Sequence, residues 1–244
     1  MSKGRRGLIQ FFSLITVLSL SACGGGDESG SGEKNLCFDN GIYAANAVTK
    51  VEYIESDRLS SETRTETGVV LSTNASFNSV EGLIERQISI GITSQTGETS
   101  PFTTTYSSSY MKIQDSGVPL QYGSVAFGRA GTQRIRVYTP AYEDARRKLT
   151  PGEELTFSMV GTDTITGFMP SGPTPFSQTT RVKFVGVESL RLPSGDYQAC
   201  RYDVSVNGSS VTKEWLYRGL VIRTEYPSGF ISEMKSGTLN KLPI

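Results

Sequence analysis

Residues 197–217 read YQACRYDVSVNGSSVTKEWLY, and this stretch decides the fold class. From residue 200 to residue 206 every second side chain is apolar, which is the period of a strand with one buried face. Asn207-Gly208 then interrupts the alternation, and this pair is the strongest short signal for a tight hairpin turn. Because residues 211–217 again have strand composition, the stretch predicts an antiparallel β-hairpin.

The same pattern continues on both sides of this hairpin. Residues 181–192 are rich in Val, Phe and Leu and end at the turn sequence Pro-Ser-Gly-Asp. On the other side, the Arg-Gly pair at 218–219 precedes a strand at 220–226, and Pro-Ser-Gly precedes another at 230–234. Five short strands joined by tight turns predict a β-meander.

The earlier part of the chain is dense in Thr, Ser, Val, Ile and Tyr, which suits a sheet with one solvated face. We expect one helix, over residues 141–149, and an exposed loop over residues 163–178. The predicted fold is therefore mainly β, an antiparallel meander forming a curved sheet, half-barrel or barrel with little helix. Further strands are predicted at 48–54, 62–71, 83–92, 99–113, 118–127 and 133–138.

The amino terminus has the composition of an export signal. Three cations and no acidic residue precede an apolar run of 13 residues at 8–20, which is shorter than the ~20 residues a membrane-spanning helix needs. The tetrapeptide Leu20-Ser21-Ala22-Cys23 follows. It resembles the lipobox of bacterial lipoproteins, which implies a signal peptide at 1–22 and lipidation of Cys23 after cleavage. The alternative is an ordinary secretory signal with a chance cysteine.

The lipobox resemblance also implies a location. Several acyl chains hold a lipoprotein stably on a membrane. Gly24 occupies the position where Asp favours retention at the inner membrane in enteric-type bacteria, so we expect the outer membrane of a Gram-negative bacterium. Residues 23–35 are expected to be the lipidated cysteine and a flexible Gly/Ser linker, of which residues 24–34 have a coil-like reach of about 17–20 Å. Residues 36–244 then form a single β domain, with two domains as the alternative.

Charge and composition exclude several function classes. Removing the signal takes three of the 24 Lys and Arg residues and leaves 21 against 24 Asp and Glu, so the mature chain is slightly acidic and no nucleic-acid partner is expected. The chain has no histidine, which removes the commonest general base and metal ligand. We expect no metal, no cofactor and no enzymatic activity.

Two kinds of sequence motif could still suggest catalysis. Ser-x-x-Lys occurs three times, but in strand or turn sequence rather than on the helical turn that penicillin-binding enzymes use. Adjacent carboxylates occur at Glu143-Asp144 and Glu153-Glu154, and neighbours on a strand point to opposite faces. Both are better explained as solvated surface. The Ser-Lys pairs are Ser109/Lys112, Ser210/Lys213 and Ser232/Lys235.

The cysteines predict one disulfide. With Cys23 lipidated, Cys37 and Cys200 remain, and an even pair in an exported protein favours a disulfide. The alternative is two free thiols. A bond between them would connect the start of the domain to a strand near its end.

A family resemblance covers about 90 residues of the carboxyl-terminal part. Residues 185–200 (VGVESLRLPSGDYQAC) and 215–222 (WLYRGLVI) resemble phrases found in exported bacterial β proteins, and residues 149–152 (LTPG) resemble the turn that precedes a strand in them. Their sheets look similar to the half-barrel of the LolA/LolB lipoprotein carriers. The resemblance implies an exported β domain, although this chain lacks the long helix that fills that half-barrel.

Aromatic residues gather in the meander. Core packing is one explanation, and an apolar ligand cradle on a curved sheet is the other. Two functions are therefore expected besides the disfavoured enzyme: an envelope lipoprotein acting by contact with partner proteins, or a carrier of lipid or another apolar ligand. The predicted ligand-binding residues are Trp215, Tyr217, Tyr226, Phe230 and Met234.

Overall fold

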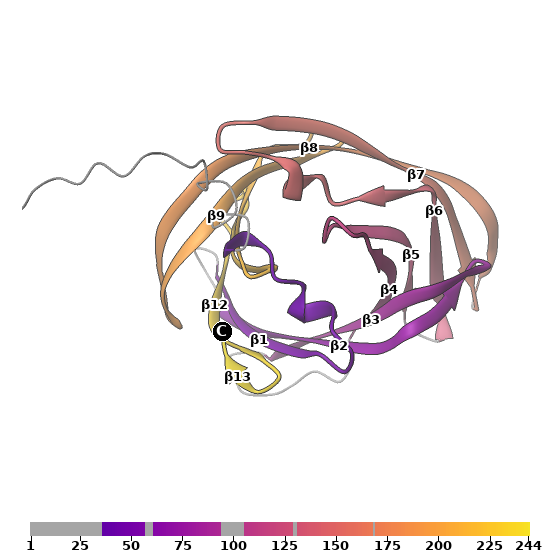
Figure 1. Ribbon diagram of the computed structural model, residues 1–244, viewed down its shortest axis with the longest axis horizontal. Helices are drawn as coiled ribbons and strands as arrows, with labels where there is room; N and C mark the ends of the chain where they lie inside the picture. Colours follow the sequence, from indigo (N-terminus) through magenta and orange to yellow (C-terminus); the bar gives the residue numbers. More distant parts are fainter. Residues whose placement is uncertain (1–35, 57–60, 94–104, 129–130, 168) are drawn as a thin grey trace, which may run out of the picture.

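The described residues form one antiparallel sheet that closes on itself. A computed structural model describes residues 36–56, 61–93, 105–128, 131–167 and 169–244. Thirteen strands within these ranges follow one another in chain order, and β1 also pairs with β12, from Thr49 opposite Leu239 to Ser56 opposite Ile231. Figure 1 shows the resulting ring of strands. The predicted mainly β fold is confirmed, and the sheet is a closed barrel of twelve strands with β13 added to β12.

Two short 3-10 helices, η1 (Asn40–Tyr43) and η3 (Ala145–Lys148), accompany the strands. The strands are β1 (Val48–Ser56), β2 (Ser61–Phe77), β3 (Val80–Thr93), β4 (Thr105–Ile113), β5 (Pro119–Phe127), β6 (Gln133–Glu143), β7 (Glu154–Thr166), β8 (Ser171–Leu192), β9 (Gly195–Val206), β10 (Thr212–Tyr217), β11 (Leu220–Glu225), β12 (Ile231–Leu239) and β13 (Leu242–Pro243).

Two hairpins confirm the turn predictions. Asn207 and Gly208, between β9 and β10, have φ angles of 50° and 72°. Arg218 and Gly219, between β10 and β11, have φ angles of 51° and 81°. Positive φ at both central positions is the requirement of the hairpin turn whose twist matches the flanking strands.

Two predicted segments were wrong. Residues 163–178 are not an exposed loop, because β7 runs to Thr166 and β8 begins at Ser171, and the two strands pair over this region. The segment has three prolines, which favour a loop, but Pro170 directly precedes β8 and Pro173 and Pro175 lie within its extended backbone. Residues 141–149 are not a helix: β6 continues to Glu143, and only the single turn η3 follows.

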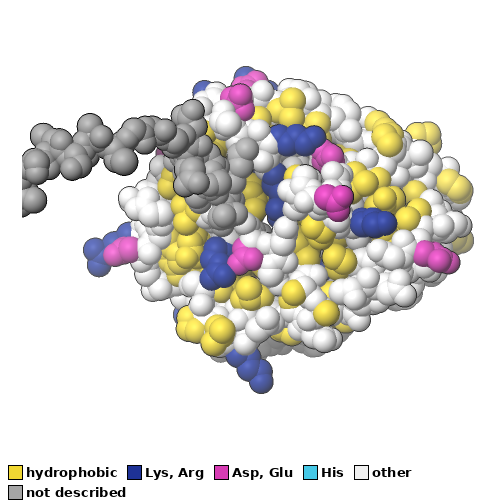
Figure 2. All heavy atoms as spheres, viewed as in Figure 1, with side chains coloured by type: hydrophobic (Ala, Val, Ile, Leu, Met, Phe, Trp, Pro, Cys, Tyr) yellow, Lys and Arg dark blue, Asp and Glu magenta, His cyan; other side chains and the backbone are white. Residues whose placement is uncertain are grey.

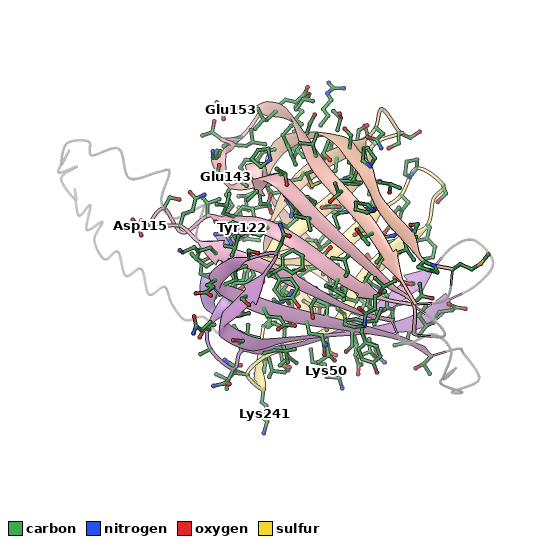
Figure 3. All side chains as sticks on the ribbon, turned by 90° about the vertical axis from the view of Figure 1, so that its right-hand side faces the viewer. Lys50, Asp115, Tyr122, Glu143, Glu153 and Lys241 are labelled. Atoms are coloured by element: carbon green, nitrogen blue, oxygen red, sulfur yellow. A yellow bond between two sulfur atoms is a disulfide. The ribbon has the colours of Figure 1, made fainter. Side chains whose placement is uncertain are left out.

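Because consecutive strands alternate in direction, their connections fall at two opposite ends of the barrel. We call the end with the β4–β5, β6–β7, β8–β9 and β10–β11 connections the near end. The opposite end, with the β5–β6, β7–β8, β9–β10 and β11–β12 connections, is the far end. Figure 3 places Asp115 of the β4–β5 turn, Glu143 at the end of β6 and Glu153 of the β6–β7 connection together at the near end.

The amino-terminal segment, residues 36–47, packs at the near end. The N–H groups of Arg218 and Gly219 donate hydrogen bonds to the carbonyls of Leu36 and Cys37, at 2.9 and 2.8 Å. Cys37 forms the predicted disulfide with Cys200 of β9, with 5.5 Å between their Cα atoms. The segment is thus fixed to the hairpin β10–β11 and to the wall of the barrel.

Two core clusters pack against opposite faces of β9. Ala199 and Cys200 are adjacent and both fully buried, so their side chains point to different faces. Cluster 1, around Ala199, extends to Leu192 and Met234 and is bordered by the β8–β9 turn, where the Ser194 hydroxyl donates to the Met234 carbonyl at 2.9 Å. Cluster 2, around Cys200, consists of Cys37, Leu149, Val182, Phe184, Cys200, Tyr202 and Leu216.

Within the described ranges, no helix has the length and hydropathy that a membrane span requires.

Candidate functional site: the barrel interior

The barrel interior contains a hollow that identifies the concave face of the sheet. This inner hollow, of about 230 Å³, is lined by side chains from six consecutive strands, β5 to β10, and by residues next to η3. Such a set can meet only on the concave side. Val182 and Val204 line the hollow and also belong to cluster 2 or pack against it, so cluster 2 fills the interior toward the near end.

Arg146 lies in the wall of the inner hollow between two carboxylates. Its guanidinium binds Asp144 at 2.7 Å and Glu214 of β10 at 3.1 Å. Burial alone would raise the pKa of Asp144, but the charge and hydrogen bonds of Arg146 outweigh it and hold that pKa below its usual value. The Tyr202 hydroxyl donates to the Arg146 carbonyl at 3.4 Å, so this part of the interior is cross-linked.

A polar belt crosses the interior beyond this hollow. Strand register places five residues side by side on β3 to β7. Asp163 of β7 lies four residues from Met159, which lines the inner hollow. Because residues an even number apart on a strand share a face, Asp163 and its four neighbours face inward. The belt consists of Arg86, Ser109, Ser124, Arg136 and Asp163.

Both arginines of the belt are fixed. Arg136 binds Asp163 through two hydrogen bonds of 2.7 and 2.8 Å, and its guanidinium lies 3.5 Å from the centroid of the Phe176 ring. These bonds hold the pKa of the Asp163 carboxyl below its usual value. Arg86 is 8% exposed and donates to the Thr49 hydroxyl at 3.0 Å.

A second hollow lies between the polar belt and the far end. This far-end hollow has a volume of about 360 Å³ and lies two residues further along the same strands. Across β3 to β7 the register gives the row Ile88, Ser107, Ala126, Arg134 and Ile165, all on the inner face. Two small side chains, Ser107 and Ala126, lie in the middle of this row, and we call them the floor of the hollow. Its lining is completed by Ile90, Tyr106, Phe127, Gly128 and Thr132.

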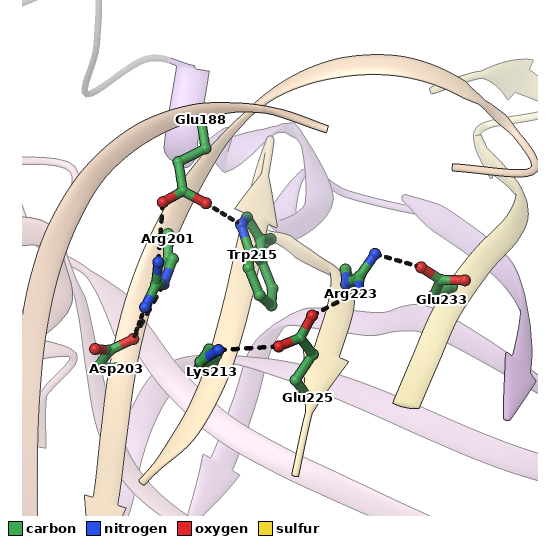
Figure 4. Close-up of polar contacts among 8 residues, drawn as sticks. All are labelled: Glu188, Arg201, Asp203, Lys213, Trp215, Arg223, Glu225 and Glu233. Carbon is green, nitrogen blue, oxygen red and sulfur yellow. Dashed lines mark hydrogen bonds and ion pairs between the residues drawn. The ribbon is translucent and has the colours of Figure 1, made fainter. Parts of the chain in front are cut away.

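The outer face of β8 to β12 has a ladder of charges around Trp215, which Figure 4 shows. Trp215 pairs with Arg201 on one side and Arg223 on the other, and their guanidinium carbons lie 5.7 and 5.3 Å from its ring. Its indole N–H donates to Glu188 at 2.9 Å. The remaining members of the ladder are Asp203, Lys213, Glu225 and Glu233.

A third hollow, of about 600 Å³, lies at the near end between the amino-terminal segment and the β4–β5 turn. Burial opposes ionisation of Asp39 there, but the Gly41 N–H and the Arg218 guanidinium hold its pKa below the usual value. Arg147 donates to the Gly117 carbonyl at 2.9 Å. Figure 2, which views the barrel as Figure 1 does, shows acidic side chains beside basic ones on this face.

The structure brings three of the five predicted ligand-binding residues together. Trp215 and Met234 are 5% and 0% exposed in cluster 1, and Tyr217 packs against that cluster. Tyr226 and Phe230 lie apart from them at the far end, with ring centroids 5.5 Å from each other. Trp215 and Met234 are therefore almost fully buried and present little surface to a ligand. Ligand binding by these five residues stays a prediction.

The other sequence motifs are placed as follows. Cys23 lies outside the described residues. Ser109/Lys112 and Ser232/Lys235 each lie on one strand three residues apart, so their side chains point to opposite faces. Lys213 forms an ion pair with Glu225 rather than approaching Ser210. The adjacent carboxylates bind different cations: Glu143 binds Lys148 and Asp144 binds Arg146.

Within the described ranges, no three Cys, Asp or Glu side chains are grouped so that they could hold a metal ion.

Sequence reasoning did not identify Arg134, Arg136 or Asp163 as interior residues. A signal was present in the alternation of residues 133–138 (QRIRVY), but it does not say which face is inward, because arginines and β-branched residues alternate there.

No protein-family model and no curated protein sequence matches this chain. Two solved structures are similar over 84% of this chain and 99% of their own. One, from Bacteroides fragilis, is described as an exported protein with a YmcC-like fold and has a TM-score of 0.42 at 12% identity. The other, from Parabacteroides distasonis, is described as a lipoprotein and has a TM-score of 0.36 at 10% identity.

Proposed function

We propose that the mature protein is a lipoprotein anchored through Cys23 to the outer membrane, with a non-catalytic role, and that it contacts envelope partners through the far end of its barrel. The observation that carries this proposal is the site at which the chain enters the fold. Leu36 and Cys37 are fixed at the near end by two backbone hydrogen bonds and a disulfide. An anchor at Cys23 therefore tethers the near end and leaves the far end free to meet a partner.

The compartment is supported by the disulfide. Disulfides persist in oxidising environments such as the bacterial periplasm and the cell surface. The Cys37–Cys200 bond is therefore compatible with export, which the amino-terminal signal composition also favours.

The far end has the apolar character expected of a contact surface. Ten large hydrophobic side chains are exposed among the described residues, and five of them lie at this end. Single exposed hydrophobic residues are ordinary, but a concentration of them on one part of a surface marks an interaction site. The five residues are Tyr106, Phe127, Met169, Val211 and Tyr226.

Site-specific photo-crosslinking in cells tests this function. With a photoreactive residue in place of Tyr226, we expect a discrete protein adduct, and none with the same residue in place of Leu71, which is 51% exposed on the barrel side. Val211→Asp, at a far-end position that does not line the far-end hollow, is expected to abolish the Tyr226 adduct, while Leu71→Asp leaves it unchanged. An adduct from position 71 alone, or one insensitive to Val211→Asp, contradicts contact through the far end.

A second candidate, binding of an apolar ligand, is favoured by one specific observation. The far-end hollow has about 360 Å³, within the ~300–1,000 Å³ typical of small-ligand pockets, and its walls are largely apolar. It lies on the inner face, whereas Trp215 belongs to the outer ladder.

A further inference from the structure

Among the described residues that line the far-end hollow, one is charged, and it is a cation. Arg134 lies in the row between Ala126 and Ile165 and remains exposed at the mouth of the hollow. Its charge helps to lower the pKa of Asp163, but among the ion pairs of the described residues none includes Arg134. Asp163, the nearest acid along β7, uses both oxygens to bind Arg136.

The apolar part extends from Arg134 to the opposite wall. From β6 the row passes over Ala126 and Ser107, two small side chains, to Ile88 of β3, with Ile90 beside it. Three strand spacings of about 4.8 Å separate Arg134 from Ile88, so the trough is roughly 14 Å across. Its length and apolar walls suit a flexible hydrocarbon chain.

The polar belt closes the inner side of this trough. Arg86 donates to Thr49 and Arg136 binds Asp163, and burying hydrocarbon against these charged groups would cost free energy because it removes the water around them. A chain in the trough is therefore confined to the far-end row and does not reach the inner hollow.

We propose that the far-end hollow binds an anionic amphiphile, with its acyl chain over Ser107 and Ala126 against Ile88 and its anionic head group on Arg134. The proposal rests on the second candidate function; it shares Tyr106 and Phe127 with the contact surface but is tested separately from the contact role. A free fatty acid and an anionic phospholipid share this chemistry. An exposed arginine suits such a ligand because the head group remains in water while the chain is buried.

Photoaffinity labelling tests this site. The full-length protein is incorporated into phosphatidylcholine nanodiscs and incubated with diazirine-labelled palmitic acid, its methyl ester, or diazirine-labelled phosphatidylglycerol. We expect the acid, the phosphatidylglycerol or both to label peptides from β3 to β5, and the two arms distinguish the sources. Labelling confined to other strands overturns the proposal.

Variants separate the two parts of the site. Ala126→Leu fills the floor and is expected to abolish labelling by every probe, whereas Ala45→Leu, at an exposed position of the amino-terminal segment, leaves it unchanged. Arg134→Gln is expected to reduce labelling by the acid about three- to fivefold without affecting the ester, since exposed charge pairs contribute little. Arg191→Gln, which removes a cation with a 92% exposed side chain, is the control.

An unchanged acid-to-ester ratio in Arg134→Gln overturns the head-group assignment, and unchanged labelling of folded Ala126→Leu overturns the site. If thermal melting shows that Ala126→Leu does not fold, Ser107→Val narrows the same floor and replaces it. Loss of the Tyr226 protein adduct in cells would leave these results unaffected, so the contact role and the ligand site fail separately.

Discussion

The backbone N–H of Arg218 donates a hydrogen bond of 2.9 Å to the carbonyl of Leu36, and this bond fixes the position at which the amino-terminal segment meets the barrel. The Arg218 side chain reinforces it by binding Asp39 at 2.7 Å. The chain thus enters the folded domain at one defined end. In a tethered protein, that end carries the tether, and the opposite end carries no attachment through this segment.

The anchor gives the first prediction. Cys23→Ser removes the thiol that the lipid attachment requires, so we expect a precursor that is uncleaved or a form released in soluble state. Metabolic labelling with palmitate and detergent phase partitioning measure this. Cys200→Ser is the matched control and should keep the acyl label. A Cys23→Ser protein that keeps its label would show that the lipobox interpretation is wrong.

The second prediction concerns the disulfide. Cys37→Ser is expected to lower the free energy of unfolding by about 2–5 kcal/mol, because the bond closes a loop with a sequence separation of 163 residues. Urea denaturation measures the loss, and reduction of the wild type should reproduce it. Equal midpoints for wild type, variant and reduced protein would contradict a stabilising role.

The third prediction is a pH dependence at the polar belt. The Asp163 pKa is depressed in the fold, so its stabilisation is fully present above the unfolded pKa of about 4 and is lost as pH falls through the lower folded value. Asp163→Asn is expected to cost about 1–3 kcal/mol at pH 7 and less below pH 4. Denaturation series at both pH values measure it. Asp196→Asn, whose side chain is 83% exposed, should show no such trend.

The fourth prediction compares two glycines on paired strands. A Cβ at Gly161 would lie 1.8 Å from the Val137 carbonyl oxygen, so Gly161→Ala forces β6 and β7 apart and is expected to cost about 1–3 kcal/mol or more. A Cβ at Gly172 meets nothing within 4 Å, and Gly172→Ala should stay within about 0.5 kcal/mol of the wild type. Similar melting temperatures for both variants would contradict the register of β6 and β7.

The fifth prediction separates packing from binding at Trp215. Because the indole is 5% exposed and bonded to Glu188, Trp215→Ala is expected to destabilise the fold by about 3–5 kcal/mol. Leu71→Ala, at an exposed position, should be nearly neutral. Labelling by the amphiphile probes should persist in Trp215→Ala under conditions where it remains folded. Loss of labelling in a folded Trp215→Ala protein would instead favour the cradle that the sequence suggested.

The meander could be predicted from the sequence because its information is local. Alternation at residues 200–206 and the turn at Asn207-Gly208 determine a hairpin without reference to the rest of the chain. The β7–β8 hairpin could not be found in this way, since Pro173 and Pro175 suggest a loop, and the pairing of Pro175 with Thr162, 13 positions earlier, leaves no local signal in the sequence.

The candidate site was missed for a different reason. Ser107, Ala126 and Arg134 are separated along the chain and become neighbours only through the register of three strand pairs. Alternation shows that a strand has two faces, but closure of the barrel decides which face is concave. Clustered aromatic residues suggest a ligand site in the sequence, whereas small side chains such as Ser107 and Ala126 give no such signal although they leave the space for a hollow.

The pairing of β1 with β12 has a consequence for biogenesis. Thr49 meets Leu239, so in the exported protein that we propose, the first strand of the barrel acquires its second neighbour only when almost the entire chain has been translocated. Until then both β1 and the most recently exported strand present unpaired edges, which are templates for aggregation. Contacts of such long sequence separation also form slowly. The nascent barrel is thus expected to depend on periplasmic chaperones during export, and to do so most strongly before residues 231–239 emerge.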